Sequence, residues 1–270
     1  MVAKVLLLVI FFAVMIGIGI YARKHATNVN GFVLGGRSVG PWLTAFAYGT
    51  SYFSAVVFVG YAGQFGYRYG MASTWIGIGN ALLGSLLAWV VLGRRTRIMT
   101  KHLKSMTMPD FFAKRYDSKS LRVAASMIAF IFLIPYTASV YNGLSSLFGM
   151  AFDIDYRLCV IVMAVLTGVY VIIGGYMATA LNDLVQGIIM LLLNGHGGFM
   201  SAVKELAAVP SEVMPGAYTS FFGPDPLNLL GVVILTSLGT WGLPQMIQKF
   251  YAIKDERAVH TGTIISTLFA

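Results

Sequence analysis

Long runs without a single charged residue constrain this fold more than any motif does. Eight runs contain no Asp, Glu, Lys or Arg: 5–22, 38–67, 69–93, 123–152, 158–182, 184–203, 226–248 and 258–270. An α-helix needs about 20 apolar residues to cross the hydrocarbon core of a bilayer. Charged residues make up 11% of the chain, too few to cover the surface of a water-soluble protein of 270 residues. The chain is therefore predicted to be an all-α polytopic membrane protein.

The charge-free runs predict seven complete membrane helices and the start of an eighth. The expected helices lie near 3–21, 42–65, 71–92, 122–147, 158–174, 177–193 and 227–247. An eighth helix starts near 260 and is cut off by the end of the chain at residue 270. The first could be a signal peptide, but Arg23 and Lys24 follow it directly and no small-residue cleavage site precedes them. We therefore expect a permanent span.

The segment 158–193 is too long for one ordinary crossing and short for two. Gly174-Gly175 offers a hairpin between two shorter helices. Two crossings with the N-terminus outside place most of the 19 Lys and Arg residues on the cytoplasmic side, as the positive-inside rule requires, and one crossing fits that rule less well. The net charge of +9 then reflects anchoring at the cytoplasmic face of the cell (inner) membrane, and nucleic-acid binding is not expected.

Two of the predicted spans contain residues that weaken a helix near mid-membrane. The second span carries a Gly and several hydroxyl residues over 47–54, and the seventh carries Gly239, Gly242 and Pro244. Freed backbone groups are tolerated in a bilayer only where they line a cavity or bind something, and paired interruptions are a sign of a transporter's binding site. A kink packed against neighbouring helices is the alternative for either one alone. Together they favour a binding site.

Asp183 is the carboxylate that falls inside a predicted span, where a charge is costly and usually functional. The alternative is that Asp183 caps the sixth helix, because it follows Gly174-Gly175 by about two turns. The sequence leaves both open. Thr107 and Pro109 predict a helix start before a short helix at the inner surface.

Catalytic and metal-binding patterns are not apparent in the sequence. The single cysteine, Cys159, rules out a disulfide framework, and the four histidines show no paired-ligand spacing. No Ser/His/Asp arrangement falls at membrane depth, so an intramembrane enzyme is a weak alternative.

Four segments together resemble the sodium:solute symporter family, which includes sodium/proline, sodium/pantothenate and sodium/sugar carriers. The first is Phe32-Val33-Leu34-Gly35-Gly36-Arg37-Ser38, and the second runs from Pro109-Asp110-Phe111-Phe112 to Arg115-Tyr116. The third is Gly174-Gly175 followed by Asn182-Asp183-Leu184-Val185-Gln186-Gly187. The fourth is Trp241-Gly242-Leu243-Pro244-Gln245 with Gln248, Lys249, Phe250 and Lys254. Each segment is moderately specific, but their order and spacing cover nearly the whole chain.

The resemblance implies a LeuT-like transporter fold of two inverted five-helix repeats within a single transmembrane domain over 1–270. Residues 3–21 would form an extra leading helix, 42–193 the first repeat, and 227–270 the start of the second. The resemblance further implies sodium ligands at the backbone carbonyls of Thr50 and Phe53, with Asp183 assisting a second sodium ion. It implies that the small organic solute is contacted by Ser51, Tyr52, Ser54, Val57, Thr74, Ser237, Thr240 and Trp241.

The sequence departs from the family pattern at three places. Tyr52 stands where proline-type members carry an aspartate. The sixth helix is short, since its apolar residues give way to Asn194-Gly195-His196, which suggests an internal deletion. The chain also stops within the eighth helix, so it represents a little over half of a transporter and lacks most of the second repeat.

The sequence therefore predicts a sodium-coupled symporter that imports an amino acid, a carboxylate such as pantothenate, or a sugar. The sodium ion, the solute, the lipid bilayer and a missing C-terminal repeat are its expected partners. The alternative is a non-transporting membrane module, either a sensor or a truncated transporter remnant.

Overall fold

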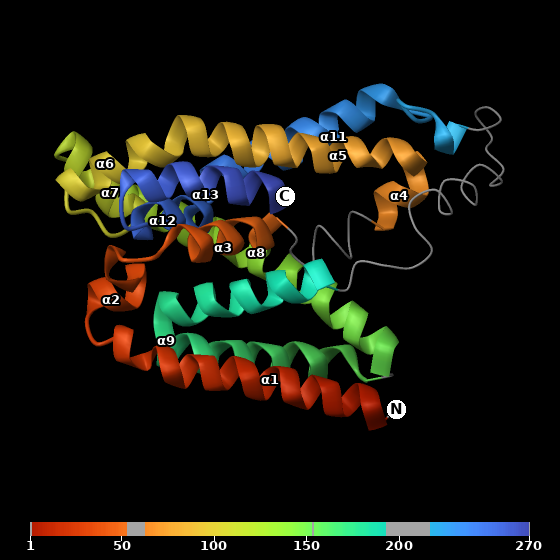
Figure 1. The fold of residues 1–270 in the computed structure, drawn as a ribbon, viewed down its shortest axis with the longest axis horizontal. Helices are drawn as coiled ribbons and strands as arrows, with labels where there is room; N and C mark the ends of the chain where they lie inside the picture. Colours follow the sequence, from red (N-terminus) through yellow and green to blue (C-terminus); the bar gives the residue numbers. More distant parts are fainter. Residues whose placement is uncertain (1, 53–62, 153, 193–216, 270) are drawn as a thin grey trace.

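The computed structural model describes residues 2–52, 63–152, 154–192 and 217–269, and its regular elements in these ranges are helices (Figure 1). An isolated parallel bridge joins Val39 to Ile253. The elements of the first half are α1 (Val2–Ala22), η1 (Arg23–His25), α2 (Val29–Leu34), η2 (Gly35–Arg37), α3 (Pro41–Tyr52), α4 (Gly63–Tyr69), η4 (Gly70–Ser73), α5 (Thr74–Gly79), η5 (Asn80–Leu87), η6 (Trp89–Gly93), α6 (Arg94–His102) and α7 (Met108–Tyr116). Those of the second half are α8 (Lys119–Phe152), α9 (Tyr156–Leu192), η7 (Ala217–Thr219), α11 (Pro226–Gly239), η8 (Thr240–Gly242), α12 (Pro244–Ala252) and α13 (Glu256–Phe269).

Four helices among the described residues are long and apolar enough to cross a membrane. They span Val5–His25, Gln64–His102, Lys119–Ser145 and Tyr156–Ile189, and the bent pair α11–α12 makes a fifth if it counts as one span. The predicted second span is described only in part, since 53–62 lie outside the described residues, as do the end of the sixth helix and most of the loop after it. The predicted third span is longer than expected, because the helix runs on through α6 to His102.

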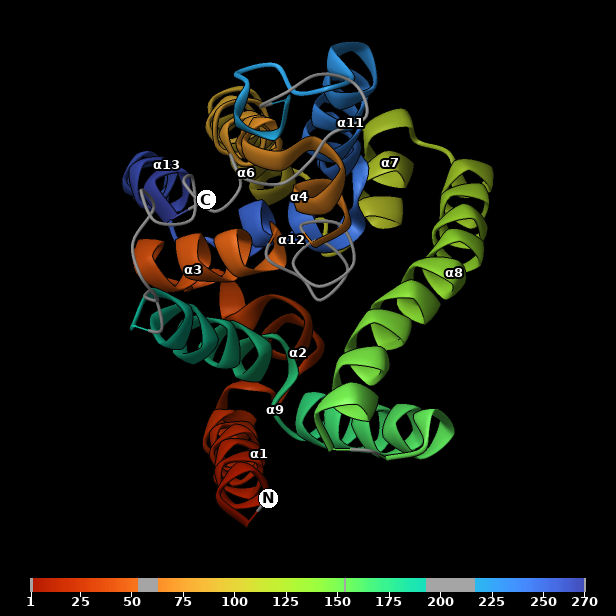
Figure 2. The same ribbon diagram turned by 90° about the vertical axis from the view of Figure 1, so that its right-hand side faces the viewer.

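The predicted break at Gly174-Gly175 is present within α9. Gly175 has φ 57° and ψ −149°, a conformation outside the helical region, and the chain reverses direction there (Figures 1 and 2). A Cβ atom on Gly175 would lie 2.6 Å from the carbonyl oxygen of Phe32, so α2 approaches the turn closely. The break divides the long apolar segment into two limbs, as the hairpin interpretation predicts.

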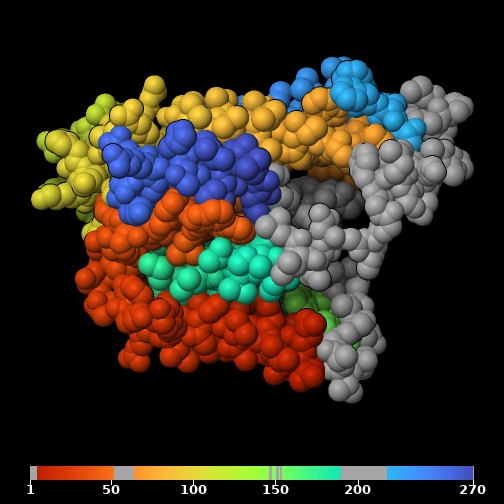
Figure 3. Space-filling model, in the orientation of Figure 1, coloured from red at the N-terminus to blue at the C-terminus, as the bar shows by residue number. Residues whose placement is uncertain are grey.

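The packed centre of the protein forms where α3, α12 and α13 meet η5 and η6. The rings of Tyr48, Trp89 and Phe250 lie with their centroids 5.0–5.5 Å apart, and the Tyr48 hydroxyl donates to the carbonyl oxygen of Gly84 at 3.2 Å. In the space-filling view, α13 lies between α3 and the 80–100 segment, and the second limb of α9 lies between α3 and α1 (Figure 3). Buried aromatic rings of this size supply much of the packing energy of a core.

Helix α8 stands apart from these layers (Figure 2). Its large apolar side chains are exposed, including Phe130 at 71% and Phe132 at 69%. A membrane helix in contact with lipid carries such side chains, because acyl chains are as apolar as a protein core.

Candidate functional site

The seventh predicted span is interrupted where the sequence predicts it. Helix α11 ends at Gly239, one short turn follows in η8, and Leu243 is extended with φ −70° and ψ 124° before α12 begins at Pro244. The two helices are bent by 53°. Trp241 Nε1 donates to the carbonyl oxygen of Leu83 at 3.0 Å, which ties the break to η5. Proline lacks the N–H that would continue the helical hydrogen bonds, which accounts for the break.

The predicted interruption of the second span is absent over 47–52, the part of it that the structure describes. Helix α3 continues over Gly49 and Thr50 to Tyr52, and the Thr50 hydroxyl donates to the carbonyl oxygen of Phe46 at 2.9 Å. Gly49 is instead a close-packing position, because a Cβ atom there would collide with the Phe269 ring of α13. Only the backbone of Tyr52 is described, and Phe53, Ser54 and Val57 lie outside the described residues.

This packing makes Gly49→Val more damaging than Thr50→Ala. The valine side chain would displace the Phe269 ring, an overpacking change that typically costs about 1–3 kcal/mol. Thr50→Ala removes one hydroxyl whose bond stays within its own helix, and it should cost less than about 1 kcal/mol. Thermal unfolding in detergent measures both. Equal losses in the two variants would contradict the packing of Gly49 against α13.

A cavity of about 380 Å³ lies between α2, α3, α12 and the two limbs of α9. It brings together one acidic group, one basic group and several amides and hydroxyls that are far apart in the sequence. Its lining consists of Phe32, Val33, Ser51, Val171, Gly175, Tyr176, Thr179, Asp183, Gln245, Gln248 and Lys249. Of the predicted site residues, Ser51 and Asp183 meet here.

Lys249 is the basic group of this cavity, and its side chain is only 6% exposed. Its Nζ donates to the carbonyl oxygen of Ala47 and to the Ser51 hydroxyl, both on α3. Counting charges along the sequence gave Lys249 no role of its own. The bend after α11 turns this face of α12 inward, so the ammonium lies between helices.

Asp183 faces the same cavity from the second limb of α9. It lies well beyond the first turn after Gly175, where a side chain cannot reach the free N–H groups of the helix start. The capping interpretation is therefore wrong. The carboxylate has no hydrogen-bond or ion-pair partner among the described residues, and Lys249 acts on it electrostatically across the cavity.

Thr74, Ser237, Thr240 and Trp241, the other predicted solute residues whose side chains are described, do not line this cavity. Ser237 is fully buried and donates to Asn80 Oδ1 at 3.1 Å between α11 and η5. Thr240 donates to the carbonyl oxygen of Ser237 at 3.0 Å, beside the Trp241 contact described above. Thr74 is exposed and donates to the carbonyl oxygen of Met71 at 2.8 Å. These four residues lie along α5, α11 and η8, whereas Ser51 and Asp183 lie on α3 and α9.

Four residues that line the cavity were given no functional role from the sequence: three on α12 and one on α9. Gln245, Gln248 and Lys249 share one face of α12 by their helical spacing, and Tyr176 directly follows the Gly175 break. Both amide atoms of Gln245 and the Tyr176 hydroxyl are buried, and no described residue forms a hydrogen bond with them. A sequence signal for the three α12 residues does exist. They are polar, they share one face of a helix, and that helix directly follows a break in a membrane span.

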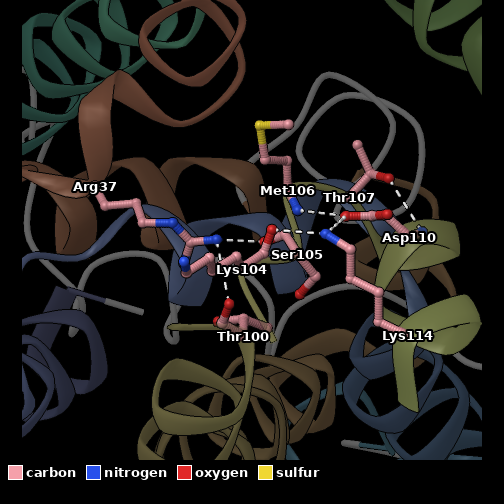
Figure 4. A network of polar contacts seen from close by, with 8 residues as sticks. All are labelled: Arg37, Thr100, Lys104, Ser105, Met106, Thr107, Asp110 and Lys114. Atoms are coloured by element: carbon pink, nitrogen blue, oxygen red, sulfur yellow. Dashed lines mark hydrogen bonds and ion pairs between the residues drawn. The ribbon is translucent and has the colours of Figure 1, made fainter. Parts of the chain in front are cut away.

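A second polar network closes one end of the molecule around Arg37 (Figure 4). The guanidinium donates to the carbonyl oxygens of Tyr251 and Thr100, each at 3.4 Å, and to that of Ser105. Burial, and secondarily the nearby Arg97 charge, lowers the pKa of Arg37 from its ordinary value. Next to it, Lys114 pairs with Asp110 at 2.9 Å and donates to the carbonyl oxygen of Lys104. The network joins η2 to the ends of α6 and α12 and to the loop before α7.

The Thr107 helix start predicted from the sequence is part of this network. Thr107 caps α7 by accepting from the Asp110 backbone N–H at 3.3 Å, and Pro109 occupies the first turn. The Asp110 carboxylate in turn accepts from the Met106 N–H at 3.1 Å.

The chain was compared with protein families and with curated proteins. The model of the sodium:solute symporter family matches residues 32–270. The chain belongs to the sodium:solute symporter family. The sodium/proline symporters of Staphylococcus aureus strains JH9, JH1 and Mu3 are each 33% identical to it over 270 aligned positions, which cover 93% of this chain and 50% of the relative. The chain spans about half the length of the curated relatives it matches.

Family membership confirms the resemblance that the sequence segments carried. A sodium:solute symporter is a membrane transporter and not an enzyme, so the intramembrane-enzyme alternative is set aside. The all-helical architecture with four or five candidate spans agrees with this family.

Proposed function

We propose that this chain carries the ion and solute sites of a sodium-coupled symporter that imports a small organic solute by alternating access. The observation that carries the proposal is the match to the symporter family over 32–270. The broken span α11–α12 supports it, since discontinuous membrane helices supply the free backbone groups that bind ions and solutes at mid-membrane. We further propose the LeuT-like fold, in which 42–193 form one repeat and 227–270 begin its inverted partner, with the N-terminus outside.

Sodium is a hard cation that oxygen ligands satisfy. We propose that it binds at the carbonyl oxygens of Thr50 and Phe53, with Asp183 holding a second ion. The family match supports this assignment, while α3 is helical to Tyr52 and Phe53 lies outside the described residues. The Asp183 carboxylate, which lines the cavity without a hydrogen-bond or ion-pair partner among the described residues, supports its role.

The solute is proposed to contact Ser51, Tyr52, Ser54, Val57, Thr74, Ser237, Thr240 and Trp241. It belongs to the amino acids, to small carboxylates such as pantothenate, or to the sugars. L-Proline heads the panel of test solutes because the curated relatives are named sodium/proline symporters.

Uptake into liposomes that contain the protein purified from its native membrane tests the proposal. We expect a labelled solute to accumulate under an inward sodium gradient and not under a matched potassium gradient. An interior-negative potential should increase accumulation, because each 100 mV adds about 2.3 kcal/mol per sodium ion. Uptake that is equal with and without sodium would contradict the coupling. An absence of uptake of any solute would favour the non-transporting module.

A further inference from the structure

We propose that Lys249 and Gln245 form a carboxylate-binding subsite in the α3–α9–α12 cavity, and that sodium at Asp183 activates this subsite. The inference rests on the proposed function and narrows its solute class to molecules with a carboxylate group. In this proposal, sodium binding and carboxylate binding are coupled because both change the net charge of the same cavity.

Lys249 supplies the positive charge of the subsite. An ammonium group has three N–H donors, and two of them are used by the Ala47 carbonyl and the Ser51 hydroxyl. Among the described residues no carboxylate lies within ion-pair distance of Nζ. A buried charge without a close counter-ion is costly, so a bound anion would stabilise this position.

Gln245 lies one helical turn before Lys249 and supplies a second donor on the same face of α12. Its Nε2 and Oε1 atoms are buried, and neither has a hydrogen-bond partner in the part of the chain that the structure describes. Buried polar groups are nearly always paired, so an amide left unpaired at a cavity wall points to a missing ligand. An ammonium and an amide N–H one turn apart match the two oxygens of a carboxylate.

The charge of the cavity explains why sodium would be required. With Asp183 ionised and Lys249 protonated, the two charges cancel and an incoming anion gains little. A sodium ion bound to Asp183 leaves the cavity with one net positive charge, which one carboxylate neutralises. Sodium and carboxylate would then each raise the affinity of the other, because thermodynamic coupling between two sites is reciprocal.

The size of the cavity agrees with an organic anion. Its volume of about 380 Å³ exceeds what a lone ion fills and falls in the lower part of the range of small-molecule sites. The remaining walls are apolar at Val33 and Val171 and aromatic at Phe32, so they suit a short hydrocarbon body.

Acetate is the probe that tests the subsite apart from transport. In a Cys159→Ala, Thr179→Cys protein, the new thiol lines the cavity, and its labelling rate by a neutral maleimide reports whether the cavity is filled. Thermal unfolding of the unsubstituted protein is the second readout. We expect sodium acetate to slow labelling and to raise the unfolding temperature more than either potassium acetate or sodium chloride does, because a bound ligand stabilises the folded state.

Substitutions at Lys249 and at Asp183 separate the roles of the two charged residues. Lys249→Gln should weaken acetate protection at least about tenfold, because a hydrogen bond to a charged group is lost, and Lys249→Arg should retain part of it. Asp183→Asn removes the negative charge that sodium would neutralise, so potassium acetate should now protect as well as sodium acetate. Lys254→Gln, at an exposed lysine beyond the same helix, is the control and should leave protection unchanged.

Each outcome decides the proposal. Absence of acetate protection in the unsubstituted protein, or protection that persists in Lys249→Gln, overturns the subsite. Protection that still requires sodium in Asp183→Asn overturns the charge mechanism. Acetate protection without sodium-driven uptake would support the subsite and contradict the proposed function. Sodium-driven uptake without acetate protection would support the proposed function and contradict the subsite.

Discussion

Gly175→Ala is expected to lower the free energy of unfolding by about 3 kcal/mol or more, which combines backbone strain with a steric clash. At φ 57° and ψ −149°, Gly175 occupies a region that side-chain-bearing residues rarely adopt. The new Cβ atom would also lie 2.6 Å from the Phe32 carbonyl oxygen and 2.9 Å from its ring. Relief of either strain requires the two limbs of α9 to move relative to α2. Thermal unfolding in detergent and the yield of monodisperse protein measure the effect.

Gly168→Ala is the matched control on the first limb of α9. A Cβ atom there meets nothing within 4 Å, so this change should be neutral or slightly stabilising through helix propensity. If the two alanine variants unfold at the same temperature, the reversal at Gly175 is not the conformation of the folded protein.

Arg37→Gln is expected to destabilise the protein by about 2–4 kcal/mol, since three carbonyl groups lose a charged donor together. Arg37 also has φ 56°, in the left-handed region, directly after two glycines with φ 57° and 69°. Such a backbone persists only when its surroundings hold it in place. The guanidinium bonds to Thr100, Ser105 and Tyr251 supply that restraint, so their loss should also loosen the link between η2 and α3. Hydrogen exchange over 35–40, with thermal unfolding, measures both effects.

Two further substitutions separate this network from the general effect of removing a charge. Arg94→Gln breaks the exposed pair with Glu256, whose side chains are 70% and 48% exposed, and it should change stability by less than about 1 kcal/mol. Arg37→Lys keeps the charge but not the planar fork of donors, and it should retain only part of the stability. Similar losses in Arg94→Gln and Arg37→Gln would mean that the carbonyl bonds of Arg37 contribute nothing beyond charge.

Local signals in the sequence set the positions of most membrane helices and of the breaks in α9 and between α11 and α12. These signals each affect the backbone within a few residues of their own position. They are the charge-free runs of membrane length, Pro244 after two glycines, Gly174-Gly175 and the Thr107 cap. Local signals of this kind do not depend on which elements pack together, so α1, α8, the α11–α12 break and the α7 start follow the prediction. The family segments also depend only on residue order, and the family match confirmed them.

Which helix faces meet depends on the packing of the whole chain. In a membrane protein the lipid-facing and core-facing sides of a helix are both apolar, so periodicity does not show which side turns inward. For that reason the sequence did not show that Lys249 is buried, left the role of Asp183 open, and did not show that Gly49 packs against α13. The bend at Leu243 and the reversal at Gly175 rotate α12 and α9 toward α3, and this rotation brings Ser51, Asp183 and Lys249 to one cavity while Ser237 and Thr74 stay with α5 and α11.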